Sequence, residues 1–280
     1  MQISPEPMYV VLGSVVAIVT VAVWYYRRNK YTLPDLHYVD SNLHRHILKT
    51  KPGFTSPYRP PFWLQNNHLH TIIATFVPKP KVTFKREYVD LDDGGVVALD
   101  WAQGGSKPVS DTSTILIVVP GLTASADNMS ELCNMALKRG YRVVVFNKRG
   151  HGDSVLATPK MQGFGDAKDM RHCVEYLRDK NPAAKLVSVG SSAGSGLLAS
   201  YLGEYGADCH LATARTIPFP LGRNIPFHLF RENSNWLLAT TSKGGHCGFL
   251  EESTLTPWSD RLALDYIDAV LEFQAAENEL

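Results

Sequence analysis

The sequence predicts an α/β fold with a mostly parallel sheet and helices on both faces, and two observations indicate it. Three continuous apolar runs recur at residues 114–119, 142–146 and 185–189, and such runs are typical of strands buried on both faces. Residues 128–138 and 167–180 between them carry apolar side chains at helical spacing. Strands that alternate with helices form parallel sheets with right-handed crossovers.

The composition excludes several classes of protein. The chain has 280 residues, of which 44% are hydrophobic, which excludes a disordered tail. Its 28 basic residues balance 27 acidic ones, so no nucleic-acid partner is expected. The four cysteines are scattered without a C-x-x-C pair, which argues against a zinc ribbon or a disulfide framework. No G-x-G-x-x-G or G-K-[ST] motif follows a strand, so no nucleotide cofactor is expected.

The first element of the chain is an apolar segment near the N-terminus. Residues 8–26 hold nineteen residues without a charge and would span roughly 28 Å as a helix, which matches the hydrocarbon core of a bilayer. Aromatic Trp24 and basic Arg27 follow the pattern of an interfacial aromatic belt beside a basic anchor, and the side of the membrane stays open. Glu6 and the missing A-x-A site disfavour a cleaved signal peptide. We expect a single-pass anchor in the endoplasmic reticulum or another endomembrane.

Two further parts follow the anchor. Residues 27–80 are rich in proline and histidine, which predicts an irregular arm on the surface of a domain. The pairs His44-x-His46 and His68-x-His70 have no cysteine or carboxylate cluster nearby, so no metal site is expected. Residues 81–280 form the α/β domain, which opens with a predicted hairpin whose turn is 92–95.

The strand at 185–189 is followed directly by Gly190-Ser191-Ser192-Ala193-Gly194 and then by a helix. This is the G-x-S-x-G pattern of a strained strand-to-helix turn that exposes a nucleophilic serine. Small residues alone are common in ordinary turns, so the flanking strand and helix carry the interpretation. Ser192 is the candidate nucleophile, and the N–H of Ala193 at the helix N-terminus is a candidate donor to an oxyanion.

Two other loops supply candidate partners for Ser192. Residues 120–123 (PGLT) follow the strand at 114–119, and the N–H of Leu122 is the candidate second donor to the oxyanion. His246 lies between glycines after a plausible last strand at 236–241. A serine followed along the chain by a histidine base matches the order found in α/β-hydrolases.

Several strings along the chain occur together in one known family. They are Asn67-His68-Leu69-His70-Thr71, Asp93-Gly94-Gly95, Leu99-Asp100-Trp101, Pro120-Gly121-Leu122-Thr123, Val145-Phe146-Asn147-Lys148-Arg149-Gly150, Gly190-Ser191-Ser192-Ala193-Gly194, Tyr201-Leu202-Gly203 and Gly244-Gly245-His246-Cys247-Gly248-Phe249-Leu250-Glu251. Through them, residues 35–261 resemble the membrane-anchored α/β-hydrolase-domain lipases of the YheT type, whose eukaryotic members resemble acylglycerol lipases and phospholipases. The resemblance implies an α/β-hydrolase fold, with Ser192 as nucleophile and His246 as general base.

The chain departs from this family after the serine. The family carries a long insertion there, with the lid and the strand that ends in the acid of the catalytic triad. Only 53 residues separate Ser192 from His246, and the carboxylates among them, Glu204, Asp208 and Glu232, fit surface positions better. The triad acid is therefore unknown, and the cap region is expected to be incomplete.

Two functions remain open at this point. The first is a membrane-bound serine esterase or lipase that hydrolyses carboxylic esters of acyl lipids, either acylglycerols or phospholipids. The second is a catalytically weak or inactive, membrane-tethered α/β-hydrolase-like protein with a binding role, because loss of the acid from a serine triad costs about four orders of magnitude in turnover. The intact serine, histidine and PGLT loop favour the enzyme.

Overall fold

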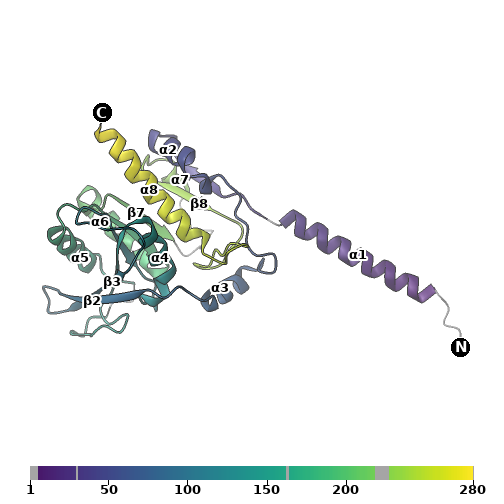
Figure 1. Cartoon of the computed structure of the whole chain (residues 1–280), viewed down its shortest axis with the longest axis horizontal. Helices are drawn as coiled ribbons and strands as arrows, with labels where there is room; N and C mark the ends of the chain where they lie inside the picture. Colours follow the sequence, from purple (N-terminus) through teal and green to yellow (C-terminus); the bar gives the residue numbers. More distant parts are fainter. Residues whose placement is uncertain (1–5, 30, 162–163, 218–226, 280) are drawn as a thin grey trace.

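A computed structural model describes residues 6–29, 31–161, 164–217 and 227–279. Its centre is a six-stranded sheet with the order β2-β3-β5-β4-β6-β7 (Figure 1). The strands are β2 (Thr83–Asp90), β3 (Val96–Gln103), β4 (Ile115–Val119), β5 (Arg142–Asn147), β6 (Leu186–Ser191) and β7 (Thr213–Ile217). Strands β5, β4, β6 and β7 are parallel, and β3 is antiparallel to both of its neighbours. The predicted mostly parallel sheet is therefore confirmed.

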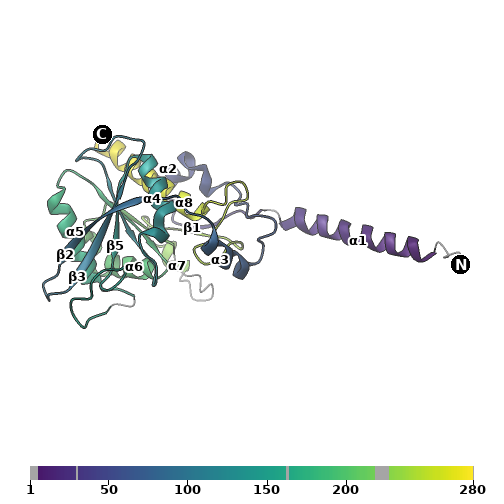
Figure 2. The same ribbon diagram turned by 60° about the horizontal axis from the view of Figure 1, so that its bottom comes forward.

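Helices cover both faces of this sheet, as the sequence predicted (Figure 2). Helices α5 (Ala167–Lys180) and α6 (Ala193–Tyr205) pack on one face, where Val174, Leu177 and Leu198 are fully buried. Helices α4 (Ser130–Arg139) and α8 (Trp258–Asn278) pack on the other. Burial on both sides explains why β4 is apolar along its whole length.

Local signals set the ends of these helices. The side chain of Asp166 accepts a hydrogen bond from the N–H of Lys168 and caps the N-terminus of α5. Helix α4 ends at Gly140, which has φ +93°, a left-handed conformation that a glycine adopts without steric cost. These caps fix where the chain turns back toward the next strand.

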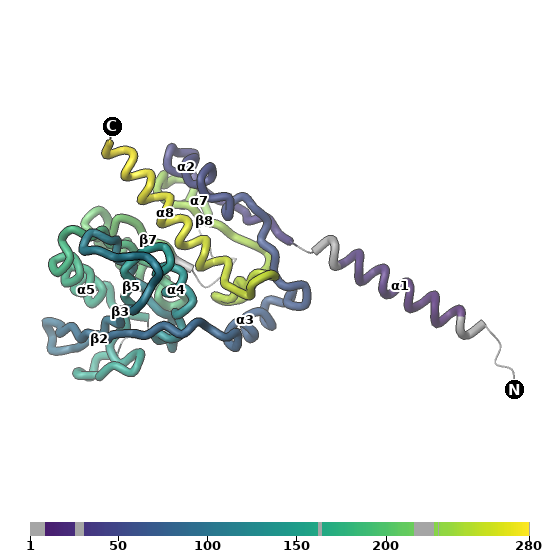
Figure 3. The backbone as a smooth tube through the Cα atoms, in the orientation of Figure 1, coloured from purple at the N-terminus to yellow at the C-terminus, as the bar shows by residue number. Residues whose placement is uncertain are grey.

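The arm is more regular than the sequence predicted. It contains β1 (Asp35–Tyr38), α2 (Asn42–Thr50), the short 3-10 helix η1 (Pro52–Phe54) and α3 (Asn67–Phe76). Side chains of Ser41 and Asn66 cap the two α-helices, and every proline of the arm lies outside α2 and α3. Figure 3 shows α2 beside α8, and this part of the arm contributes the fully buried Ile47 to a shared core. Tertiary packing overrides a composition that favours irregular structure.

The predicted last strand is present but lies elsewhere. Strand β8 (Leu237–Thr240) pairs antiparallel with β1 in a separate two-stranded sheet. Between β7 and β8 the structure describes only the short helix α7 (Phe227–Phe230), and residues 218–226 lie outside the described residues. Strand β8 therefore pairs with β1 of the arm instead of with a strand of the main sheet.

The predicted membrane anchor coincides with helix α1 (Glu6–Asn29), which projects away from the domain (Figure 1). The apolar side chains described along it are exposed, among them Val16 and Trp24. Nevertheless, within the described residues no helix combines the length and the apolar character needed to cross a membrane. The structure therefore supports a helix here but does not support the prediction that it spans a bilayer.

Candidate active site

Ser192 occupies a strained turn between β6 and α6. Its backbone angles are φ +53° and ψ −120°, a conformation that costs a non-glycine residue of order 1–3 kcal/mol. Such strain persists only where the surroundings impose it, and it is typical of a turn that presents a nucleophile. The turn places Ser192 at the carboxyl end of β6, which lies between β4 and β7 in the sheet, and directly before the N-terminus of α6.

Glycines on both sides make this turn possible. A Cβ at Gly190 would lie 2.6 Å from the carbonyl oxygen of Gly194, and a Cβ at Gly194 would lie 2.1 Å from that of Val119. No real Cβ tolerates such contacts. A Cβ at Gly121 would lie 3.6 Å from Ser192 Oγ. Strand, helix and PGLT loop therefore meet backbone to backbone around the serine.

The structure brings Ser192 and His246 together. Ser192 Oγ lies 2.8 Å from His246 Nε2, which is within hydrogen-bond distance. Both side chains come from loops 54 residues apart in the sequence. Burial lowers the pKa of His246 below its ordinary value of 6.5 because the neighbouring protein atoms replace water that would solvate the imidazolium. The imidazole is thus held in the neutral form that can accept a proton.

Helix α3 of the arm holds the histidine loop, which the sequence did not reveal. Thr71 Oγ1 accepts a hydrogen bond of 2.8 Å from the backbone N–H of His246. His70 Nε2 accepts one of 2.9 Å from the N–H of Leu250, and burial lowers the pKa of His70 to about 4. His70 is therefore a neutral structural acceptor. Residues 67–71 belong to the strings that carry the family resemblance, so the sequence marked them as a shared feature. Their contact with the histidine loop became evident only in the tertiary structure.

Two candidate oxyanion donors lie beside the serine. Ala193 is the first residue of α6, and the first N–H groups of a helix have no partner within that helix. Leu122 follows Gly121, whose backbone approaches Ser192 closely. The structure thus places both predicted residues in chain segments that border Ser192 Oγ.

The three carboxylates considered from the sequence lie on the surface. Glu204 is near the end of α6, Asp208 is in the 3-10 helix η3 (Gly206–Cys209), and Glu232 follows α7. All three are exposed, as the sequence indicated. None of them is identified as the acid of a catalytic triad.

Two other strings of the resemblance have structural roles. Arg149 forms ion pairs with Asp169 at 2.6 Å and with Asp93 at 2.8 Å, and its guanidinium fills the space where a side chain at Gly95 would lie. Asp100 is 3% exposed and pairs with Arg86 at 2.7 Å. Arg149 thus ties the turn of the hairpin and helix α5 to the segment after β5, and the pair of Arg86 with Asp100 joins the two strands of the hairpin. These contacts support the sheet rather than the reaction.

Several known proteins resemble this chain over part of its length. Residues 114–224 match the family model described as the alpha/beta hydrolase fold. Protein ABHD15 from Homo sapiens is 39% identical over 166 residues, which are 56% of this chain and 36% of that protein. Embryogenesis-associated protein EMB8 from Picea glauca is 33% identical over 208 residues, 70% of this chain and 44% of that protein.

A third relative carries an enzyme name. Phospholipase ABHD3 from Bos taurus is 30% identical over 193 residues, which are 67% of this chain and 47% of that protein. The chain spans less than half the length of each of these three relatives. The match to the family model includes strands β4 to β7 and the turn at Ser192, whereas β2, β3 and His246 lie outside it.

Proposed function

We propose that this protein is an alpha/beta hydrolase that acts as a membrane-bound serine hydrolase and cleaves carboxylic esters of acyl lipids. The observation that carries the proposal is the 2.8 Å contact between Ser192 Oγ and His246 Nε2 at a strained strand-to-helix turn. A hydroxyl beside a neutral imidazole is the arrangement of an activated nucleophile. The phospholipase name of one relative supports acyl lipids, either phospholipids or acylglycerols, as the substrate class.

The proposed reaction proceeds in two halves. Ser192 Oγ attacks the ester carbonyl carbon while His246 Nε2 takes the hydroxyl proton, and the N–H groups of Leu122 and Ala193 stabilise the negative oxygen. Collapse of this intermediate breaks the bond to the alcohol, which leaves with the proton from His246. Water then attacks the acyl-serine while His246 takes a proton from it, the bond to Ser192 Oγ breaks, and the carboxylic acid departs as His246 returns the proton to Ser192 Oγ.

Labelling with a fluorophosphonate tests this proposal, because such probes react with activated serines. We expect the full chain in membranes to be labelled and the Ser192→Ala variant to be unlabelled. The Ser200→Ala variant, which changes an exposed serine of α6, should be labelled like the parent. A folded parent that takes no label would contradict the hydrolase proposal. It would favour the alternative, a membrane-tethered binding protein without catalysis.

The pH dependence of kcat/KM follows from the burial of His246. Its pKa lies below 6.5 in the folded protein, and only the neutral imidazole acts as a base. We expect kcat/KM for p-nitrophenyl butyrate to be constant above pH 6.5 and to fall as the pH drops through this lowered pKa. A midpoint above 6.5 would contradict the dominance of burial and would indicate a carboxylate that stabilises the imidazolium.

The membrane part of the proposal rests on helix α1, whose exposed apolar side chains include Val16 and Val19. Exposed apolar area of this kind favours transfer into lipid. We expect the chain to float with phosphatidylcholine vesicles in a density gradient and the Val16→Asp/Val19→Asp variant to remain in the aqueous fraction. Val155→Asp changes a similarly exposed valine of the domain and should float. Equal flotation of both variants would exclude α1 as the attachment.

A further inference from the structure

Helix α3 of the arm has one face against the loop that carries His246. Thr71 accepts a hydrogen bond from the backbone N–H of His246, and His70 is fully buried. A Cβ at Gly248 of the same loop would lie 2.6 Å from the Cβ of Ala74, one turn further along the helix. The inner face of α3 is therefore in direct contact with the loop that positions the candidate base.

The outer face of α3 is apolar and exposed. Leu69, Ile72 and Phe76 have exposed fractions of 42%, 55% and 76%, and their spacing of three and four residues places them in one stripe along the helix. Phe62 and Trp63, in the segment before the helix, are exposed by 59% and 48%. We call these five side chains the α3 surface. Large apolar side chains exposed together in this way are typical of a surface that contacts a partner or a membrane.

The chain around the α3 surface is basic. Residues 41–86 contain eight lysines and arginines and no acidic residue. Lys79 and Lys81 follow α3 directly, are exposed, and form no ion pair within the residues that the structure describes. Lys79 interacts with Asp260, but burial raises the pKa of that carboxyl group to about 7, so it compensates the lysine only in part. Cations beside exposed apolar side chains complement a negatively charged lipid surface.

The position of α3 favours a lipid surface over a second protein. Figure 1 and Figure 2 both show α3 on the side of the domain from which α1 leaves, so a bilayer that holds α1 also faces the α3 surface. Phe62 and Trp63 suit the boundary between headgroups and acyl chains, where aromatic side chains are enriched. Because a helix is about 10 Å thick, lipid against the outer face of α3 lies about one helix diameter from the histidine loop.

We propose that the α3 surface docks on an anionic lipid bilayer, with Leu69, Ile72 and Phe76 at the acyl boundary and Lys79 and Lys81 on the headgroups. Docking turns the candidate active site toward an acyl-lipid substrate, and in this respect the inference extends the proposed function. The binding itself depends on neither catalysis nor attachment through α1.

The test uses the full chain with Val16→Asp/Val19→Asp, so that attachment through α1 does not contribute. Flotation with vesicles of phosphatidylserine and phosphatidylcholine in equal parts, at increasing lipid concentration, gives the partition coefficient. We expect this coefficient to exceed the value for pure phosphatidylcholine by about tenfold or more, because lysines near an anionic surface are attracted to it. It should fall steeply in about 1 M sodium chloride, where the Debye length is about 3 Å.

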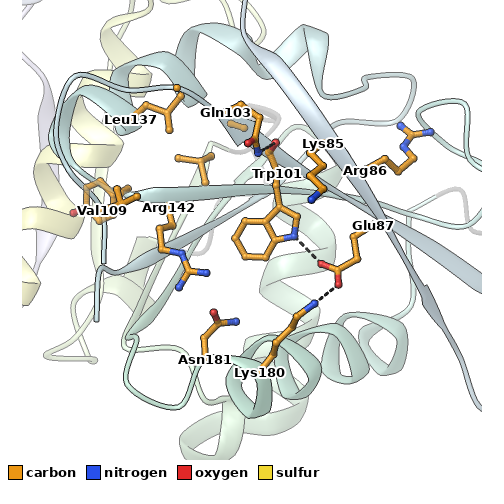
Figure 4. A pocket seen from close by; sticks show the side chains of 14 residues that line it. Lys85, Arg86, Glu87, Trp101, Gln103, Val109, Leu137, Arg142, Lys180 and Asn181 are labelled. Carbon is orange, nitrogen blue, oxygen red and sulfur yellow. Dashed lines mark hydrogen bonds and ion pairs between the residues drawn. The ribbon is translucent and has the colours of Figure 1, made fainter. Parts of the chain in front are cut away.

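Two substitutions in this background provide a matched comparison. Ile72→Asp should lower the partition coefficient about tenfold or more, because an exposed apolar side chain no longer enters the lipid. Val109→Asp makes the same change of charge at a position of similar exposure, 52% against 55%, and should have no effect. Val109 belongs to the wall of a cavity of about 600 Å³ that strands β2, β3 and β5 line (Figure 4). Lys79→Gln/Lys81→Gln should also weaken binding about tenfold or more.

Fluorescence of Trp63 reports whether this surface itself enters the lipid. Vesicles with brominated acyl chains should quench the emission that distinguishes the chain from its Trp63→Phe derivative. The absence of such quenching, equal partition of Ile72→Asp and Val109→Asp, or no preference for phosphatidylserine would overturn the proposal. A dimer that Ile72→Asp dissociates, with unchanged lipid partition, would assign the surface to a second copy instead. Lipid docking without fluorophosphonate labelling would reject the hydrolase proposal alone.

Discussion

Replacing His246 with alanine should lower kcat for p-nitrophenyl butyrate by about 10²–10⁴-fold, the usual contribution of a general base. The hydroxyl of Ser192 then keeps its position, because the strained turn is set by β6 and α6, but it loses the acceptor at 2.8 Å. The initial rate of nitrophenol release, compared with Ser192→Ala as the background, measures the effect.

Two controls separate chemistry from folding in this experiment. His228→Ala removes an exposed histidine of α7 and should keep the parental rate. Added imidazole should restore part of the activity of His246→Ala, because alanine leaves space for a free base beside Ser192. A variant that keeps the parental rate without imidazole would show that His246 is not the base.

Replacing Gly194 with alanine should destabilise the fold by about 3 kcal/mol or more, at or above the usual range for overpacking. The new Cβ would lie 2.1 Å from the carbonyl oxygen of Val119 and 2.6 Å from that of Pro120. Both are backbone atoms at the end of the central strand β4, so the contact cannot be relieved by turning a side chain. Urea unfolding followed by near-ultraviolet circular dichroism measures the loss.

Gly196→Ala is the matched control within the same helix. A Cβ at Gly196 meets nothing within 4 Å, and alanine favours a helix over glycine by up to about 1 kcal/mol. We therefore expect Gly196→Ala to be neutral or stabilising. If the two variants had the same free energy of unfolding, the close approach of α6 to the end of β4 would not be a feature of the folded protein.

The local sequence predicted the core of the domain well. The apolar runs at 114–119, 142–146 and 185–189 became β4, β5 and β6, and the segment 167–180 became α5. The turn at Ser192 was also predictable, because a strand, two flanking glycines and a helix are adjacent along the chain. These features depend on backbone conformation and on periodic burial, which neighbouring residues largely fix.

Contacts between distant segments were not predictable in this way. The pairing of β1 with β8 joins residues about 200 apart, as in Asp35 with Thr240. The hydrogen bond from the backbone N–H of His246 to Thr71 likewise joins two distant segments, and neither sequence indicates the other as its partner. The many prolines predicted an irregular arm. Composition does not indicate that α8 and β8 pack against the residues between those prolines and order them.

The sequence therefore specified strands β2 to β6 and helices α4 to α6, together with the serine turn and the candidate base, because a few adjacent residues determine each of them. The assembly of the chain determined that the arm supports the histidine loop and that β8 pairs with β1 outside the main sheet. Burial and long-range hydrogen bonds depend on which distant surfaces pack together, and that choice minimises the free energy of the whole fold rather than of any one segment.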